Sequence, residues 1–125
     1  MLLDTCALLW LVQGRGQLSQ ETLERINQEP VVYISAISGF EVGVKYAKGK
    51  LVLPATPADW LRVVLEHHDL KVLQLDLNIC LQSTQLPAVH NDPSDRLIIA
   101  TALVYQLSIV TTDPVFANYG IKTLC

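Results

Sequence analysis

The chain has 125 residues, which is long enough to bury one hydrophobic core and too short for two ordinary domains. Half of its residues are hydrophobic and 17% are charged, a composition that argues against intrinsic disorder. The formal charge of −3 argues against a plainly basic nucleic-acid-binding domain, and three widely spaced cysteines argue against a disulfide framework or a zinc site.

The chain begins with an apolar segment that carries Asp4 in its middle and has no basic residues before it. We therefore expect a core strand that runs into a helix, rather than a signal peptide. No apolar stretch approaches the roughly 20 residues that a membrane-spanning helix needs. The sequence predicts a cytoplasmic protein made of one domain, residues 1–125, with no membrane association.

Short β-rich segments alternate with helical patterns along the rest of the chain. This alternation is typical of an α/β fold with a mainly parallel sheet. The predicted strands, in chain order, are Met1–Asp4, Val31–Ser35, Leu70–Leu75, Ser108–Thr112 and Ile121–Leu124.

Each predicted helix follows a residue that can cap its start. The last long helix, Ser94–Tyr105, follows Asp92 and Pro93 and is apolar on nearly every side, so we expect it to be central to the packing. The other predicted helices run from a cap at Ser19 to Asn27, from a cap at Ser35 or Ser38 to Gly49, and from a cap at Thr56 to His67.

Five acidic residues lie at the boundaries of these elements, beside apolar segments where an unpaired charge is costly. In an open parallel sheet, ligands bind outside the carboxyl ends of the strands, where we expect these side chains to converge. Clustered carboxylates must take up protons or bind a cation, and Mg²⁺ or Mn²⁺ favours such oxygen ligands. The five residues are Asp4, Glu41, Asp92, Asp95 and Asp113.

Four of the five acids also have an ordinary structural explanation. Asp92 could be a helix cap with Asp95 as its capping-box partner, Glu41 could pair with Lys45 one turn later, and Asp113 could start a turn. Asp4, at the end of the first strand, is the hardest to explain in this way, because a structural carboxylate is uncommon there without a partner. Taken together, the matching topological positions favour a metal site that supports phosphodiester hydrolysis.

Four stretches of the sequence occur in a recognisable order along nearly the whole chain. They are Leu2–Thr5, Ile34–Ser38 leading to Glu41, His90–Ala100 and Thr111–Asp113. In that order they resemble the PIN domains, and specifically the ribonuclease toxins of VapBC-type toxin–antitoxin pairs. The resemblance implies a three-layer α/β/α sandwich around a mainly parallel five-stranded sheet. It also implies metal-dependent endonucleolytic cleavage of RNA, a small DNA-binding antitoxin as partner, and a homodimer.

The resemblance also implies roles for the acidic residues. Asp4, Glu41, Asp95 and Asp113 correspond to the acidic quartet that binds Mg²⁺ or Mn²⁺ and carries out catalysis, and Asp92 is an adjacent acid of the same motif.

Other polar residues have a functional and a structural interpretation. Thr5 and Thr112 could orient a carboxylate or a metal-bound water, or could be a helix cap and a strand residue. Lys45 and Lys48 could hold the RNA backbone, or could belong to a solvated helix face. Arg96 could contact phosphate or lock the acidic cluster.

Two other functions compete with the nuclease. A PIN-fold binding module would cut nothing, but it would gain nothing from clustered negative charge. A phosphatase that uses Asp4 as nucleophile would want a second Asp two positions later, where Cys6 stands. The histidines, His90 among them, have no zinc-pair spacing, and none is assigned to the site.

Overall fold

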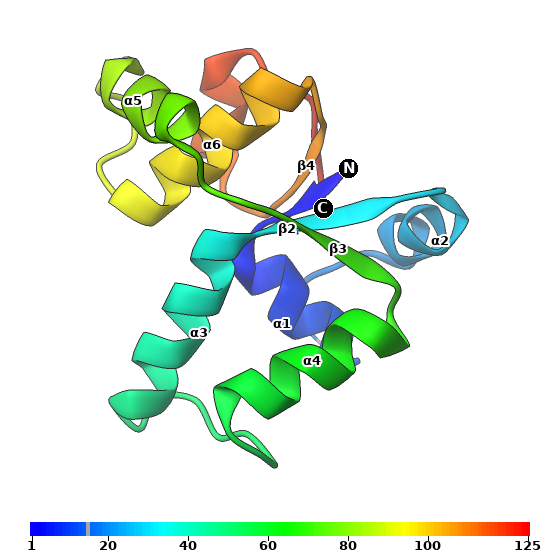
Figure 1. Ribbon diagram of the computed structural model, residues 1–125. Helices are drawn as coiled ribbons and strands as arrows, with labels where there is room; N and C mark the ends of the chain where they lie inside the picture. The colour runs from blue at the N-terminus through cyan, green and yellow to red at the C-terminus, as the bar shows by residue number, and fades with distance from the viewer. Residues whose placement is uncertain (15) are drawn as a thin grey trace.

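A computed structural model describes residues 1–14 and 16–125. Five strands form one all-parallel sheet in the order β3-β2-β1-β4-β5, with β1 at its centre (Figure 1). The predicted five-stranded parallel sheet is confirmed, with each strand shorter than predicted. The strands are β1 (Leu2–Leu3), β2 (Val32–Ser35), β3 (Leu70–Leu73), β4 (Ile109–Val110) and β5 (Thr123–Leu124).

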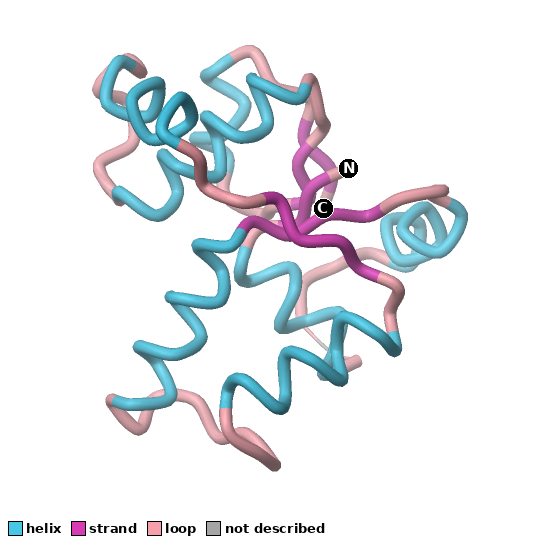
Figure 2. Tube along the Cα trace, in the orientation of Figure 1, coloured by secondary structure: helices cyan, strands magenta, loops and turns pink. Residues whose placement is uncertain are grey.

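Helices cover both faces of this sheet, so the predicted three-layer sandwich is confirmed as well (Figures 1 and 2). Successive strand residues point to opposite faces. Leu3 and Val110 belong to one hydrophobic core, with residues of α1, α2, α3 and α4. Leu2 and Ile109 belong to the other, with residues of α6, against which α5 packs. The helices are α1 (Thr5–Gln13), α2 (Gln20–Gln28), α3 (Ala36–Ala47), α4 (Pro57–His67), α5 (Leu77–Gln85) and α6 (Pro93–Tyr105).

The predicted helices begin at the expected caps. Ser19, Thr56 and Asp92 each accept a hydrogen bond from a backbone N–H in the first turn that follows. Of the two alternatives for α3, Ser35 is the cap, because its Oγ accepts from the N–H of Ile37 at 3.1 Å. The helix α6 is central as predicted, since its residues 98–102 are buried.

Two helical segments were not predicted. The helix α5 is capped by Asp76, whose Oδ1 accepts from the N–H of Ile79 at 2.9 Å, so an ordinary capping signal was present in the sequence. A 3₁₀ helix, η1 (Pro114–Tyr119), follows β4 and begins at Asp113. The structure thus places a helix start directly at one of the predicted metal ligands.

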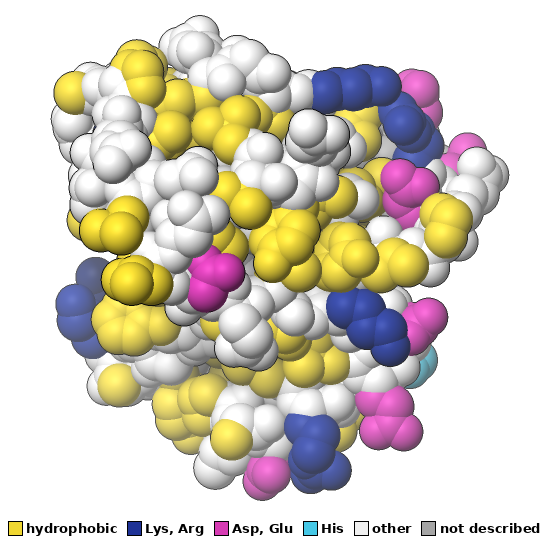
Figure 3. Space-filling view, turned by 45° about the horizontal axis from the view of Figure 1, so that its top comes forward, with side chains coloured by type: hydrophobic (Ala, Val, Ile, Leu, Met, Phe, Trp, Pro, Cys, Tyr) yellow, Lys and Arg dark blue, Asp and Glu magenta, His cyan; other side chains and the backbone are white. Residues whose placement is uncertain are grey.

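Several large apolar side chains remain exposed on α3 and α5. Phe40 is 64% exposed on α3, and Leu77 and Leu81 are 74% and 53% exposed on α5. Figure 3 shows hydrophobic side chains spread over one face of the molecule, with charged side chains mostly towards its rim. Within the described residues, no helix has both the length and the apolar character needed to cross a bilayer.

Candidate metal centre

Asp4 lies where the central strand β1 meets α1. Its Oδ1 accepts a hydrogen bond from the N–H of Ala7 at 2.7 Å and so caps α1. The residue is only 7% exposed. Burial raises the pKa of Asp4, and the charge of Asp113 adds to that rise, while hydrogen bonds from Thr111 and Ala7 oppose it. A positive charge close to Asp4 would therefore stabilise the ionised form of its carboxyl group.

Glu41 enters the site from α3 and is held by Thr5. The Thr5 hydroxyl donates to Glu41 Oε1 at 2.6 Å, and the same Oγ1 lies 2.8 Å from Ser38 Oγ. Thr5 thus orients a carboxylate, which is one of its two predicted roles, whereas the helix cap is Asp4. Burial raises the pKa of Glu41 most, and the charges of Asp92 and Asp4 raise it further.

The start of α6 supplies two acids with different surroundings. Asp92 is exposed and accepts from the N–H of Ser94 at 2.9 Å, so it is the helix cap. Asp95 lies in the first turn and faces the cavity, where burial and then the charge of Asp92 raise its pKa to about 6. Asp92 therefore serves as a cap and also adds negative charge at the rim of the site.

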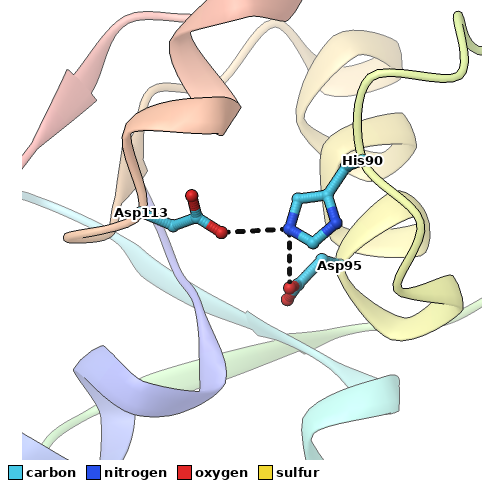
Figure 4. A group of neighbouring side chains, drawn as sticks. All are labelled: His90, Asp95 and Asp113. Atoms are coloured by element: carbon cyan, nitrogen blue, oxygen red, sulfur yellow. Dashed lines mark hydrogen bonds and ion pairs between the residues drawn. The ribbon is translucent and has the colours of Figure 1, made fainter.

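Asp113 closes the site from the end of β4, and His90 lies against it. One Asp113 oxygen, Oδ1, accepts from the N–H of Val115 at 3.0 Å and caps η1. The other, Oδ2, lies 3.0 Å from His90 Nε2, and Asp95 Oδ2 lies at the same distance from that nitrogen (Figure 4). His90 was not predicted as a site residue, because it lies in an irregular loop whose path the sequence does not reveal.

Arg96 anchors the loop that carries His90. Its guanidinium donates to four backbone carbonyl oxygens, at 2.8 to 3.1 Å: those of Ser83, Leu86, Pro87 and His90. These hydrogen bonds engage the guanidinium with the backbone of the protein itself. Among the described residues Arg96 forms no ion pair with an acid, so it does not lock the acidic cluster directly, and its contact with phosphate stays a prediction.

The acids share one cavity of about 310 Å³ at the carboxyl edge of the sheet. Lys45 is the basic residue that lines it, and its charge lowers the pKa values of Asp4 and Glu41 against the dominant effect of burial. The predicted convergence of acids from four separate segments is therefore what the structure shows. The lining residues are Asp4, Thr5, Cys6, Glu41, Lys45, Asp92, Asp95, Thr112, Asp113 and Phe116.

Thr112 and Lys48, which were also predicted to act at the site, interact less with the acidic residues than Thr5 and Lys45 do. Thr112 lines the cavity but lies just beyond β4, so it is no strand residue, and its neighbour Thr111 makes the hydrogen bond to Asp4. Lys48 is exposed at the end of α3 and does not line the cavity. Thr111 was missed because residues 111 and 112 are both Thr and both follow β4, so the sequence does not show which one faces the acid.

The raised pKa of Asp95 predicts that its contribution to stability falls as the pH rises. A carboxyl whose folded-state pKa exceeds its unfolded value stabilises the fold fully below the unfolded pKa and loses that contribution as pH rises through the folded pKa. For Asp95 this window runs from 3.8 to about 6. We compare the free energies of unfolding of the wild type and Asp95→Asn in EDTA. The wild-type value minus the variant value should fall by about 1–2 kcal/mol as the pH rises through this window, a magnitude reduced because Asp95 is partly exposed to solvent.

Urea unfolding curves of both proteins at pH 4 and pH 7.5 measure this difference. A difference between the two proteins that does not change with pH would contradict the assignment of a raised pKa to Asp95.

The fold and the cavity define an α/β/α protein with a carboxylate-lined site at the carboxyl edge of its sheet. Residues 1–122 match the PIN domain family, and the chain belongs to that family. The resemblance seen in the sequence is thereby confirmed. A curated relative, Ribonuclease VapC22 of Mycobacterium tuberculosis (strain ATCC 25618 / H37Rv), is 27% identical over 114 residues, which cover 90% of this chain and 86% of the relative.

Solved structures share the fold along almost the whole chain. In the structure of FitAcB from Neisseria gonorrhoeae, a chain that is 22% identical superposes with a TM-score of 0.69, covering 99% of this chain and 96% of that one. In the structure of DNA-bound VapBC from Salmonella typhimurium, a chain that is 24% identical gives a TM-score of 0.70, covering 98% and 94%. At these identities the likeness establishes the fold.

Proposed function

We propose that the protein is a Mg²⁺- or Mn²⁺-dependent endoribonuclease and the toxin of a type II toxin–antitoxin pair. One observation carries the proposal: five acids from four separate segments line a single cavity, where burial raises the pKa of Asp4, Glu41 and Asp95. Such a set is electrostatically unfavourable without protons or a cation. The family membership and the ribonuclease name of the curated relative support the choice of RNA.

The donor set fits a hard divalent cation. The side chains that face the cavity offer carboxylate oxygens, which Mg²⁺ and Mn²⁺ prefer. In this proposal Asp4, Asp95 and Asp113 hold the ion directly or through water, and Asp92 adjusts the charge at the rim. A bound ion would supply positive charge against the phosphate and would lower the pKa of a water molecule.

Glu41 completes the site as the residue that positions the attacking water. Its Oε1 accepts a hydrogen bond from the Thr5 hydroxyl, which orients the carboxylate so that Oε2 can accept a hydrogen bond, and then a proton, from water. The raised pKa of Glu41 brings it closer to the range in which a carboxylate is an effective general base near neutral pH. Thr5 is thus a positioning residue for the proton acceptor.

Lys45 is the residue that we expect to hold the RNA backbone beside the site, because it is the basic side chain that lines the cavity. Lys48 lies one turn further along the same helix and would contact phosphate further from the cleaved bond. Its contribution is expected to be weaker, since an exposed charge acts through solvent and salt.

The partner in this proposal is a small DNA-binding antitoxin that binds over the cavity. Solved complexes named VapBC and FitAB share this fold, and the apolar side chains exposed on α3 and α5 supply a surface for a partner. A cytoplasmic homodimer of toxin chains is part of the same proposal. Co-expression with the product of the neighbouring reading frame, followed by copurification and light scattering, tests partner and dimer together.

Removal of divalent cations is expected to abolish cleavage. Purified protein should cut single-stranded RNA in Mn²⁺ or Mg²⁺, lose the activity in EDTA, and regain it when the ion is restored in excess. Far-UV circular dichroism should stay unchanged in EDTA, because the two hydrophobic cores do not involve the acids. Gel analysis of a 5′-labelled RNA oligonucleotide measures the rate.

A single result would count against the metal requirement: cleavage at an undiminished rate in EDTA by a preparation that also lacks contaminating ribonuclease. A preparation of Glu41→Gln purified in parallel provides the contamination control, because a contaminant would persist in it.

A further inference from the structure

We propose that His90 is a positioning residue of the metal site, whose Nε2–H holds the carboxylates of Asp95 and Asp113 together in front of one cation. This inference rests on the proposed function. The nitrogen lies 3.0 Å from an oxygen of each acid, although the two acids come from different segments, α6 and the end of β4 (Figure 4). Donor atoms of all three residues lie within 4.8 Å of one another.

The hydrogen bond at the other ring nitrogen determines which nitrogen carries the proton. The backbone N–H of Asp92 donates to His90 Nδ1 at 3.2 Å, so Nδ1 is an acceptor. In a neutral imidazole the proton is then on Nε2, which donates to Asp113 Oδ2. The nitrogen that faces the acids is therefore a hydrogen-bond donor, and its lone pair is not free to bind a metal.

The imidazole is fixed by its surroundings. The backbone N–H of His90 donates to the Tyr119 hydroxyl at 2.8 Å, and its carbonyl accepts from Arg96 at 3.0 Å. The ring packs edge-on against buried Phe116, with ring centroids 5.6 Å apart. A ring held by its backbone, by packing against Phe116 and by contacts at both nitrogens can determine where the two carboxylates point.

This contact leaves the acids able to bind an ion. Each carboxylate oxygen has two lone pairs, so Oδ2 of either acid can accept from His90 and still face a cation. A donor placed between two carboxylates also offsets part of their mutual repulsion before an ion arrives. His90 would therefore favour the arrangement of acids that the ion requires.

A pair of amide substitutions separates this role from mere packing. In His90→Gln the amide nitrogen can reach the place of Nε2, whereas in His90→Asn the amide ends one bond short of it. We expect Mn²⁺ affinity, measured by calorimetry without RNA, to fall about 10-fold in His90→Asn and to stay near the wild-type value in His90→Gln. His67→Asn, at an exposed histidine in the last turn of α4, should bind like the wild type.

Melting temperatures in EDTA confirm that the variants fold, and the increase in melting temperature on addition of Mn²⁺ gives a second measure of binding. Equal affinities in the wild type and His90→Asn would overturn the role of His90 alone, as would equal weakening in the two amide variants. Tighter binding by His90→Asn would also overturn it, because the imidazole would then be a competitor of the ion. A wild-type protein that binds no Mn²⁺ would overturn the proposed function together with this inference.

Discussion

Replacement of Asp4 by Asn is expected to lower RNA cleavage about 10²- to 10³-fold and to leave the fold intact. An Asn side chain still accepts the hydrogen bond from the Ala7 N–H, so the cap of α1 survives. The lost negative charge belongs to the most buried acid of the cavity and, in the proposed mechanism, to a metal ligand. A loss of about 3–4 kcal/mol of transition-state stabilisation corresponds to this decrease.

Single-turnover cleavage of a labelled RNA oligonucleotide at saturating Mn²⁺ measures the effect. Asp76→Asn is the matched control, because Asp76 caps α5 with the same kind of hydrogen bond and lies outside the cavity. It should cleave at the wild-type rate. Wild-type cleavage by the Asp4→Asn protein would remove the basis for the assigned chemistry. In EDTA that variant should be at least as stable as the wild type, since burial raises the pKa of the acid that it lacks.

Replacement of Arg96 by Met is expected to lower the free energy of unfolding by about 2–4 kcal/mol. The variant keeps the aliphatic length of the side chain but loses donors to four carbonyl oxygens, and hydrogen bonds from a charged group contribute about 1.5–3 kcal/mol, less than additively. Urea unfolding in EDTA measures the change. Arg96→Lys should recover only part of it, since an ammonium cannot reach carbonyls spread over residues 83–90.

Arg62→Met is the control for the loss of an arginine. Arg62 makes one exposed ion pair, with Asp59 at 3.4 Å, and its replacement should cost less than about 1 kcal/mol. Equal stability losses in the two arginine variants would show that the loop is not held by Arg96. We also expect Arg96→Met to weaken Mn²⁺ binding, because one of the lost bonds is to the carbonyl of His90.

The sheet and the acidic cluster could be predicted because both follow from short-range sequence patterns and the geometry of parallel sheets. Short β-rich segments such as Val32–Ser35 identify strands, and carboxyl ends of parallel strands share one edge. That edge is where Asp4 and Asp113 meet. The ends of the strands were less predictable, because pairing partners decide where a ladder stops.

The parts that were missed depend on loops and on register. His90 reaches the acids only because Arg96 and Tyr119 hold the segment before α6, and neither contact has a sequence pattern of its own. Arg96 itself stands beside Asp95 in sequence, which suggested contact with phosphate or with the acidic cluster, although its guanidinium donates to loop carbonyls. For α5, the signal at Asp76 was available, but the helix is short and its apolar residues show weak periodicity.

Three of the acids in the cavity are also helix caps, Asp4 for α1, Asp92 for α6 and Asp113 for the 3₁₀ helix η1. The two α-helices, α1 and α6, therefore direct their N-terminal ends, and with them the positive ends of their macrodipoles, towards the cluster of negative charge. This fixed partial charge offsets repulsion without any bound ion. As a consequence, we expect the newly made chain to fold in the absence of metal, and in the proposed function an ion would serve the chemistry rather than complete the fold.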